Sequence, residues 1–129
     1  MTTRITLWRE LFSEHPRTLM QNSDFTVTAF RYASGVEGLK VQNSRGYLVI
    51  LPWMGQMIWD AQFDGHDLTM HNMFSQPKPA TEVVATYGCF AFHSGLLANG
   101  CPSPEDVHPL HGEMACAVMD EAWLELEGD

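Results

Sequence analysis

The chain has 129 residues, of which 45% are hydrophobic, and a formal net charge of −9 with histidine counted as neutral. This length fits one domain covering residues 1–129, or the N-terminal part of a larger domain, with enough apolar residues for a packed core. Seven basic residues against sixteen acidic ones are a poor match for nucleic acid or an anionic membrane surface, so we expect neither as a partner.

The N-terminal half contains short runs in which apolar and polar residues alternate, separated by turn residues. Pro52 ends the continuous apolar run Tyr47-Leu48-Val49-Ile50-Leu51, because proline cannot donate to a sheet ladder. The dipeptide Asp64-Gly65 suits a tight hairpin turn with positive φ. The expected elements of this half are a helical turn at 8–13, a strand at 25–32, a turn at 43–46, and strands at 47–51 and 55–63.

A long irregular stretch rich in proline and glycine follows, from His71 to His111. Such stretches are uncommon in compact domains unless they serve a binding site, and only residues 81–87 indicate a helical turn. Residues 121–127 alternate again and predict a strand with one wet face. Because the chain stops directly after it, we expect this strand to find its partner further along a longer chain or in another copy. The predicted class is a mainly β, antiparallel β-sandwich.

The cysteines and the N-terminal residues indicate in which cellular compartment we expect the protein. Cys89, Cys101 and Cys116 are widely spaced and form neither a CxxC pair nor a disulfide framework, so we expect buried structural thiols. The first residues lack an apolar stretch and a small-residue cleavage site, so no signal peptide is evident. We therefore expect a cytoplasmic protein.

Histidines gather in the irregular stretch, most densely in the segment Val107-His108-Pro109-Leu110-His111-Gly112-Glu113. Imidazole titrates near neutral pH, so His111 could exchange a proton with a ligand, and Glu113 could orient the ring. His108, His111 and Glu113 also carry donor atoms that transition metals accept. On a strand, however, His108 and His111 would point to opposite faces. We therefore expect no metal site, with a purely structural role for these histidines as the alternative.

Tryptophan and methionine side chains of the central region could line a groove. Indole faces stack against the C–H groups of sugars, while a few polar side chains bind the hydroxyl groups. Trp59 lies on the apolar side of the predicted 55–63 strand and is expected in the core. Trp53 stands in a turn-like context between Pro52 and Gly55, so it is the candidate for a sugar contact.

Two segments resemble the aldose 1-epimerase, or galactose mutarotase-like, superfamily. Residues 43–65, NSRGYLVILPWMGQMIWDAQFDG, are similar to the opening β-meander of that family. Residues 109–113, PLHGE, are similar to its Leu-His-Gly signature, in which the histidine contacts the bound sugar. Residues 94–100, SGLLANG, occupy the place of the family's Gly/Asn/Arg loop, although Gly100 follows Asn99 where the family usually has arginine.

The resemblance implies a supersandwich fold, with this chain as its N-terminal portion, and a concave sugar-binding face. It also implies an acid–base mechanism that opens the sugar ring, in which one group protonates the ring oxygen and another removes the anomeric hydroxyl proton. In the family, a second histidine and a glutamate base come from segments further along the chain. The candidate catalytic residue is His111, and the candidate sugar-binding residues are His111, Glu113, Asn99, His93 and Trp53.

The expected function is therefore that of an aldose 1-epimerase-like isomerase, which would bind a sugar or sugar phosphate and use no cofactor. If the natural chain ended at residue 129, we would expect its mutarotation to be weak or absent. The alternatives are a non-catalytic carbohydrate-binding β-sandwich and a small cupin-like metal-binding protein. An unpaired edge strand would also allow a homodimer, because it presents free backbone N–H and C=O groups.

Overall fold

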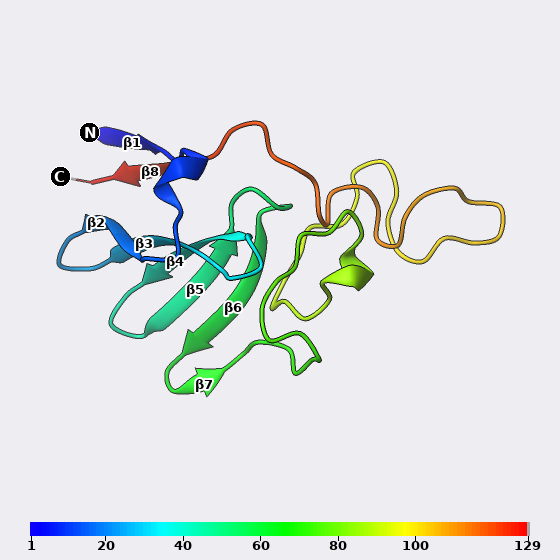
Figure 1. Cartoon of the computed structure of the whole chain (residues 1–129), viewed down its shortest axis with the longest axis horizontal. Coiled ribbons are helices and arrows are strands. Elements are labelled where there is room, and N and C mark those ends of the chain that lie inside the picture. The colour runs from blue at the N-terminus through cyan, green and yellow to red at the C-terminus, as the bar shows by residue number, and fades with distance from the viewer. Residues whose placement is uncertain (129) are drawn as a thin grey trace.

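The computed structural model describes residues 1–128, and its regular structure is almost entirely antiparallel β-strand (Figure 1). Six strands form one sheet in the order β2-β3-β4-β5-β6-β7, and β1 and β8 form a separate two-stranded ribbon. The sheet strands are β2 (Arg17–Gln21), β3 (Thr26–Arg31), β4 (Glu37–Gln42), β5 (Gly46–Leu51), β6 (Met57–Phe63) and β7 (His66–Asp67). The ribbon strands are β1 (Thr2–Thr6) and β8 (Trp123–Glu127). The prediction of a mainly β chain with antiparallel sheets is confirmed.

Helical structure is limited to two short 3-10 turns, η1 (Arg9–Leu11) and η2 (Val83–Ala85), within residues 1–128. Both lie inside the ranges where the sequence predicts a helical turn. No helix in this part of the chain combines the length and apolar composition that a membrane-spanning segment requires.

The six-stranded sheet is a meander in which each strand pairs with the next one along the chain. Between β4 and β5, the side-chain oxygen of Asn43 accepts hydrogen bonds from the backbone N–H groups of Arg45 (2.8 Å) and Gly46 (3.1 Å). Between β6 and β7, Asp64 and Gly65 have φ angles of 52° and 79°, as a tight hairpin turn requires. Both predicted turns are confirmed, and local residue chemistry sets the order of the strands.

Strands β3, β5, β6 and β8 lie where the sequence predicts strands. Strand β6 begins two residues later than predicted, because Gly55 and Gln56 adopt left-handed φ angles of 62° and 48°. Along β6, Met57, Trp59 and Ala61 are buried, as the pattern predicts. The sequence did not predict β1, β2 and β4. The first two are mostly exposed and β4 buries two consecutive residues, so none of them alternates.

One core cluster joins the ribbon to the sheet. Leu7, which follows β1, and Ala122, which precedes β8, are buried with Val27, Ala29 and Leu39 of the sheet. The pairing of β1 with β8 runs in register from Thr2–Glu127 to Thr6–Trp123. The expectation that the 121–127 strand takes its partner from further along the chain or from another copy is therefore wrong. The partner is the N-terminal strand, whose own sequence gave little sign of it.

A second core cluster attaches the irregular segment between β7 and β8 to the other part of the sheet. Val83, Cys89 and Ala115 pack with Leu51 of β5 and Trp59 of β6. The backbone of this segment also pairs with β6, because Ile58 and Ala91 exchange two hydrogen bonds of 2.9 and 3.0 Å. Parts of this irregular segment thus pack against the sheet and cover part of the edge of β6.

The cysteines divide between this core and the surface. Cys89 and Cys116 are buried in the second cluster, and burial raises the pKa of each thiol. Cys101 is exposed, so the expectation of a buried thiol is wrong at this position. The reason is that its loop contributes to neither core cluster.

A substitution at Gly46 tests whether the close approach of β5 and β6 is important for the stability of the fold. A methyl group at this position would lie 1.9 Å from the carbonyl oxygen of Gln62 on β6. We expect Gly46→Ala to lower the free energy of unfolding by about 2–4 kcal/mol, because the β5–β6 ladder must shift. The control is Gly35→Ala, whose methyl group meets nothing within 4 Å but whose φ is 95°, for a cost of about 1–2 kcal/mol. Chemical denaturation measures both, and an equal or smaller loss for Gly46→Ala would contradict this account.

Candidate functional site

Four of the five predicted sugar-binding residues lie in loops close to one another in the chain. Residues 95–100 and 109–114 form a backbone-bonded unit that we call the loop clasp. Gly95 donates its N–H to the carbonyl oxygen of His111 (3.1 Å), and His111 donates to that of Gly100 (2.8 Å). A methyl group at Gly112 would lie 2.1 Å from the carbonyl oxygen of Ala98. The glycine is therefore required by the close approach of the two loops.

The polar side chains of the loop clasp are engaged in holding its own backbone. The carboxylate of Glu113 accepts hydrogen bonds from the N–H groups of Leu96 (2.5 Å) and Leu97 (2.9 Å). These bonds, that of Leu97 first, lower the pKa of Glu113 below its usual value. Asn99 accepts a hydrogen bond from the N–H of Gly100 (2.7 Å). Glu113 and Asn99 thus have a structural role that the sequence did not reveal.

The two histidine candidates have different surroundings. His111 is half-buried, has a φ of 63°, and its ring centroid lies 5.2 Å from that of Phe92. The side chain of His93 is exposed. His108, the other histidine of the cluster, has its Nδ1 atom 2.8 Å from the carbonyl oxygen of Pro109. Residues 1–128 contain no group of three or more His, Cys, Asp or Glu side chains placed to hold a metal ion, so the donor set of the cupin-like alternative is not assembled.

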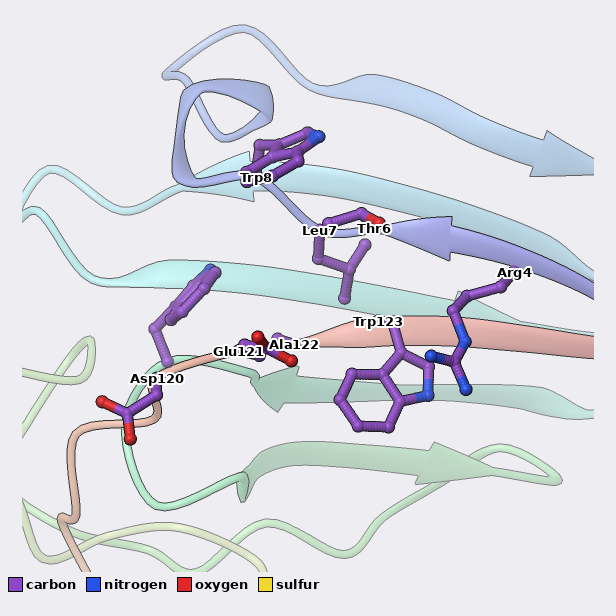
Figure 2. A pocket seen from close by; sticks show the side chains of 9 residues that line it. Arg4, Thr6, Leu7, Trp8, Asp120, Glu121, Ala122 and Trp123 are labelled. Carbon is purple, nitrogen blue, oxygen red and sulfur yellow. The ribbon is translucent and has the colours of Figure 1, made fainter.

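The remaining predicted residue, Trp53, lines a cavity of about 230 Å³ that we call the tryptophan cleft (Figure 2). This cleft lies between the ribbon and the segment that follows β5. The loop clasp, yellow to orange in Figure 1, lies toward the opposite end of the molecule from β1 and β8, and His111 does not line the cleft. The structure therefore separates Trp53 from the other candidates. The lining residues are Arg4, Thr6, Leu7, Trp8, Trp53, Asp120, Glu121, Ala122 and Trp123.

The ribbon places one wall of the cleft. Trp8 follows β1 and is 64% exposed, and Trp123 opens β8 and is 47% exposed. Arg4 on β1 stands opposite Glu125 on β8 and binds its carboxylate through Nη2 (2.6 Å) and Nε (3.0 Å). The same guanidinium lies 4.6 Å from the ring centroid of Trp123. Figure 2 shows the side chains of Arg4 and Trp123 next to each other. This ion pair and the cation–π contact orient the indole of Trp123 at the rim.

The segment after β5 forms the opposite wall of the tryptophan cleft. Gly55 donates its N–H to the carbonyl oxygen of Ala117 (2.7 Å), and Met54 forms a bridge with Val118. These contacts hold the residues leading into β8 beside Trp53 and so bring Asp120 to the cleft. A methyl group at Gly55 would lie 2.2 Å from the carbonyl oxygen of Ala115, so the approach needs glycine. Long-range backbone pairing, and not a local motif, assembles this wall.

Trp53 separates the cleft from a second cavity of about 200 Å³, which it also lines together with Arg9. The guanidinium of Arg9 lies 4.8 Å from the ring centroid of Trp53. The Nε1 atom of Trp53 is buried and finds no hydrogen-bond acceptor within residues 1–128. An unpaired buried donor costs about 1–3 kcal/mol, so the position of this indole is maintained by packing.

Trp8 and Trp123 are cleft residues that the sequence alone did not identify as site residues. One signal was present for Trp123, because it stands among glutamates on the predicted wet face of the 121–127 strand. An exposed indole marks a binding surface only where other apolar side chains join it in one patch, and the local pattern did not place such neighbours beside Trp123. For Trp8 no comparable signal exists, since it belongs to a short turn. The pairing of β1 with β8 brings Trp8 and Trp123 to the same cleft.

Glu113→Gln should loosen the loop clasp. A neutral amide oxygen accepts weaker hydrogen bonds than a carboxylate, so we expect faster amide hydrogen exchange at Leu96 and Leu97. Because the pKa of Glu113 is lowered in the folded chain, its stabilising effect should be full above the usual glutamate range and decline as pH falls through the lowered value. Glu105→Gln, an exposed residue between the two halves of the clasp, is the control. Unchanged exchange at Leu96 and Leu97 in Glu113→Gln would contradict the proposed role.

Comparisons with known proteins assign no function to this chain, so its function is proposed from the geometry of the structure. The chain matches no protein-family model, no curated protein and no solved structure. The resemblance to the aldose 1-epimerase superfamily therefore stays a prediction that rests on the short motifs quoted above. The tryptophan cleft is the cavity in which three indole side chains and two acidic residues come together.

Proposed function

We propose that this chain binds a carbohydrate in the tryptophan cleft and does not convert it. The observation that carries the proposal is that three of the four tryptophans of the chain line one cavity. At about 230 Å³ it is smaller than the roughly 300–1,000 Å³ of pockets that enclose drug-sized ligands. Its size therefore suits about one sugar ring.

The chemistry of the lining supports a sugar over a purely apolar ligand. The indoles of Trp8 and Trp123 are partly exposed and offer flat apolar faces on which the C–H groups of a sugar ring can stack. Asp120 and Glu121 supply carboxylate oxygens that accept hydrogen bonds from hydroxyl groups. Apolar faces combined with a few polar groups at the edge are the usual design of such a site.

Catalysis has weaker support than binding. Mutarotation needs a proton donor and a proton acceptor at the same sugar. The carboxylate of Glu113 is held by two backbone N–H groups, and His111 lies outside the cleft that contains Trp53. We therefore favour the non-catalytic alternative. The isomerase activity, with His111 as a catalytic residue, remains the second hypothesis.

The finer fold assignment and the wider partners also remain proposals. The ribbon packed on an antiparallel meander is compatible with the N-terminal portion of a mutarotase-like supersandwich. Strands β1 and β8 pair only with each other within residues 1–128, so each has an outer edge on which a second copy could add a strand.

Indole N–H signals test the site directly. The four tryptophans should give four indole cross-peaks in a ¹H–¹⁵N spectrum. Titration with neutral hexoses should shift the peaks of Trp8, Trp53 and Trp123, while that of Trp59, buried in the second core cluster, should stay in place. Shifts at Trp59 alone, or at no indole with any hexose or hexose derivative, would overturn the proposal.

Substitutions measure the contribution of each indole. We expect Trp8→Ala and Trp123→Ala each to weaken sugar binding by about 1–2 kcal/mol, or about 5- to 30-fold in Kd, because a stacking face is lost. Both side chains are partly exposed, so the fold should persist. Phe90→Ala removes a similarly exposed aromatic residue (44%) outside the cleft and should leave Kd unchanged.

Anomer exchange separates binding from catalysis. When a single anomer of the bound hexose is added, its conversion followed by NMR should proceed at the rate in buffer. A faster rate that is lost in His111→Ala would instead support the isomerase hypothesis and overturn the non-catalytic proposal.

A further inference from the structure

The charges around the tryptophan cleft are distributed unevenly. Asp120 and Glu121 both line it, and Arg4 is the one basic residue in the lining. The ion pairs formed among residues 1–128 are Arg4–Glu125 and Arg45–Asp64. Neither Asp120 nor Glu121 thus has a cationic partner in the described chain. Both carboxylates are available to a ligand.

The charge of Arg4 is largely offset. Its guanidinium makes two hydrogen bonds to one oxygen of Glu125, and it lies over the indole of Trp123. A guanidinium that is paired in this way has little remaining field to attract an anionic ligand. The other nearby arginine, Arg9, lies over Trp53 and lines the second cavity, not the cleft. The potential inside the cleft is therefore dominated by the two unpaired carboxylates.

The indole faces favour a cation as well. Arginines already lie over two of the three cleft tryptophans, at 4.6 Å from Trp123 and 4.8 Å from Trp53. Among residues 1–128, the ring of Trp8 has no lysine or arginine over it, and it is the most exposed of the three indoles. An ammonium group that contacts an indole face near a carboxylate gains from both the ring quadrupole and the opposite charge.

We infer that the tryptophan cleft selects sugars that carry a protonated amino group and disfavours sugar phosphates. The amine is attracted by Asp120 and Glu121 and by the open face of Trp8. A phosphate, which carries about one and a half to two negative charges at neutral pH, is repelled by the same carboxylates. The inference rests on the proposed function and specifies its substrate class. The sequence predicted a sugar or a sugar phosphate as the ligand; the inference narrows this to a sugar that carries a protonated amino group.

Three matched sets of ligands provide the test: glucose, galactose and mannose, each with its 2-amino-2-deoxy and its 6-phosphate derivative. Kd is measured from the indole shifts in slightly acidic, low-salt buffer, where the amine is protonated. We expect the amino sugar to bind about 1.5- to 5-fold more tightly than its parent hexose, the range for a pair of exposed charges. The phosphate should bind more weakly than the parent, and added salt should reduce both differences.

Variants identify the charges responsible. In the double variant Asp120→Asn/Glu121→Gln, the preference for the amino sugar should disappear, so that the amino sugar and its parent hexose bind with equal Kd. The parent hexose should itself bind more weakly than it does to the unchanged chain, because neutral amide oxygens accept weaker hydrogen bonds from its hydroxyl groups. Glu82→Gln/Glu105→Gln removes the same formal charge from exposed positions outside the cleft and should retain the preference. If both double variants lost the preference for the amino sugar equally, the inference would be overturned. The preference would then come from the net charge of the chain and not from the two carboxylates of the cleft.

The outcomes separate the inference from the proposed function. If hexoses shift the cleft indoles but their amino derivatives bind no more tightly, or the phosphates bind more tightly, the inference is overturned and the carbohydrate-binding proposal stands. If no ligand of the three sets shifts the signals of Trp8, Trp53 or Trp123, both are overturned.

Discussion

Strands β1 and β8 come from the two ends of the described chain and pair along their whole length, so that Arg4 meets Glu125, 121 positions away. Closing so long a loop costs conformational entropy before any contact compensates for it. The compensation comes from Leu7 and Ala122, which the pairing buries against the sheet. Trp8 and Trp123 reach the same cavity only because this ribbon forms. The cleft is therefore a product of the longest-range contact in the molecule.

The segment after β5 connects the two cores. Leu51 and Met54 belong to the cluster beneath the irregular layer, whereas Trp53 packs against the cluster beneath the ribbon. The backbone of the same segment holds the residues that lead into β8, through Gly55 and Ala117. A change in the packing of either core would therefore alter the position of Trp53 and the shape of the cleft that it lines. This coupling gives the site a rigid wall on one side and a partly exposed indole rim on the other.

The loop clasp and the tryptophan cleft differ in what their polar groups do. In the clasp, the carboxylate of Glu113 and the amide oxygen of Asn99 accept hydrogen bonds from the backbone of their own loops. Such groups stabilise a loop that lacks regular structure, and a ligand would have to compete for them. In the cleft, Asp120 and Glu121 have no ion-pair partner within the described residues. Because these carboxylates have no ion-pair partner and lie beside the apolar faces of the indoles, we favour the cleft over the clasp as the ligand site.

The sequence by itself determined the features that depend on neighbouring residues: the strands β3, β5, β6 and β8, the Asn43 and Asp64-Gly65 turns, and the position of Trp59 in the core. These follow from local backbone geometry and from the period of two in a half-buried strand. Tertiary structure alone decided that β8 pairs with β1, that Cys101 is exposed, and that Trp53 meets Trp8 and Trp123 and not His111. The physical reason is that these outcomes depend on which distant segments pack together, and hydrophobic burial is non-directional, so a local pattern cannot specify its partner.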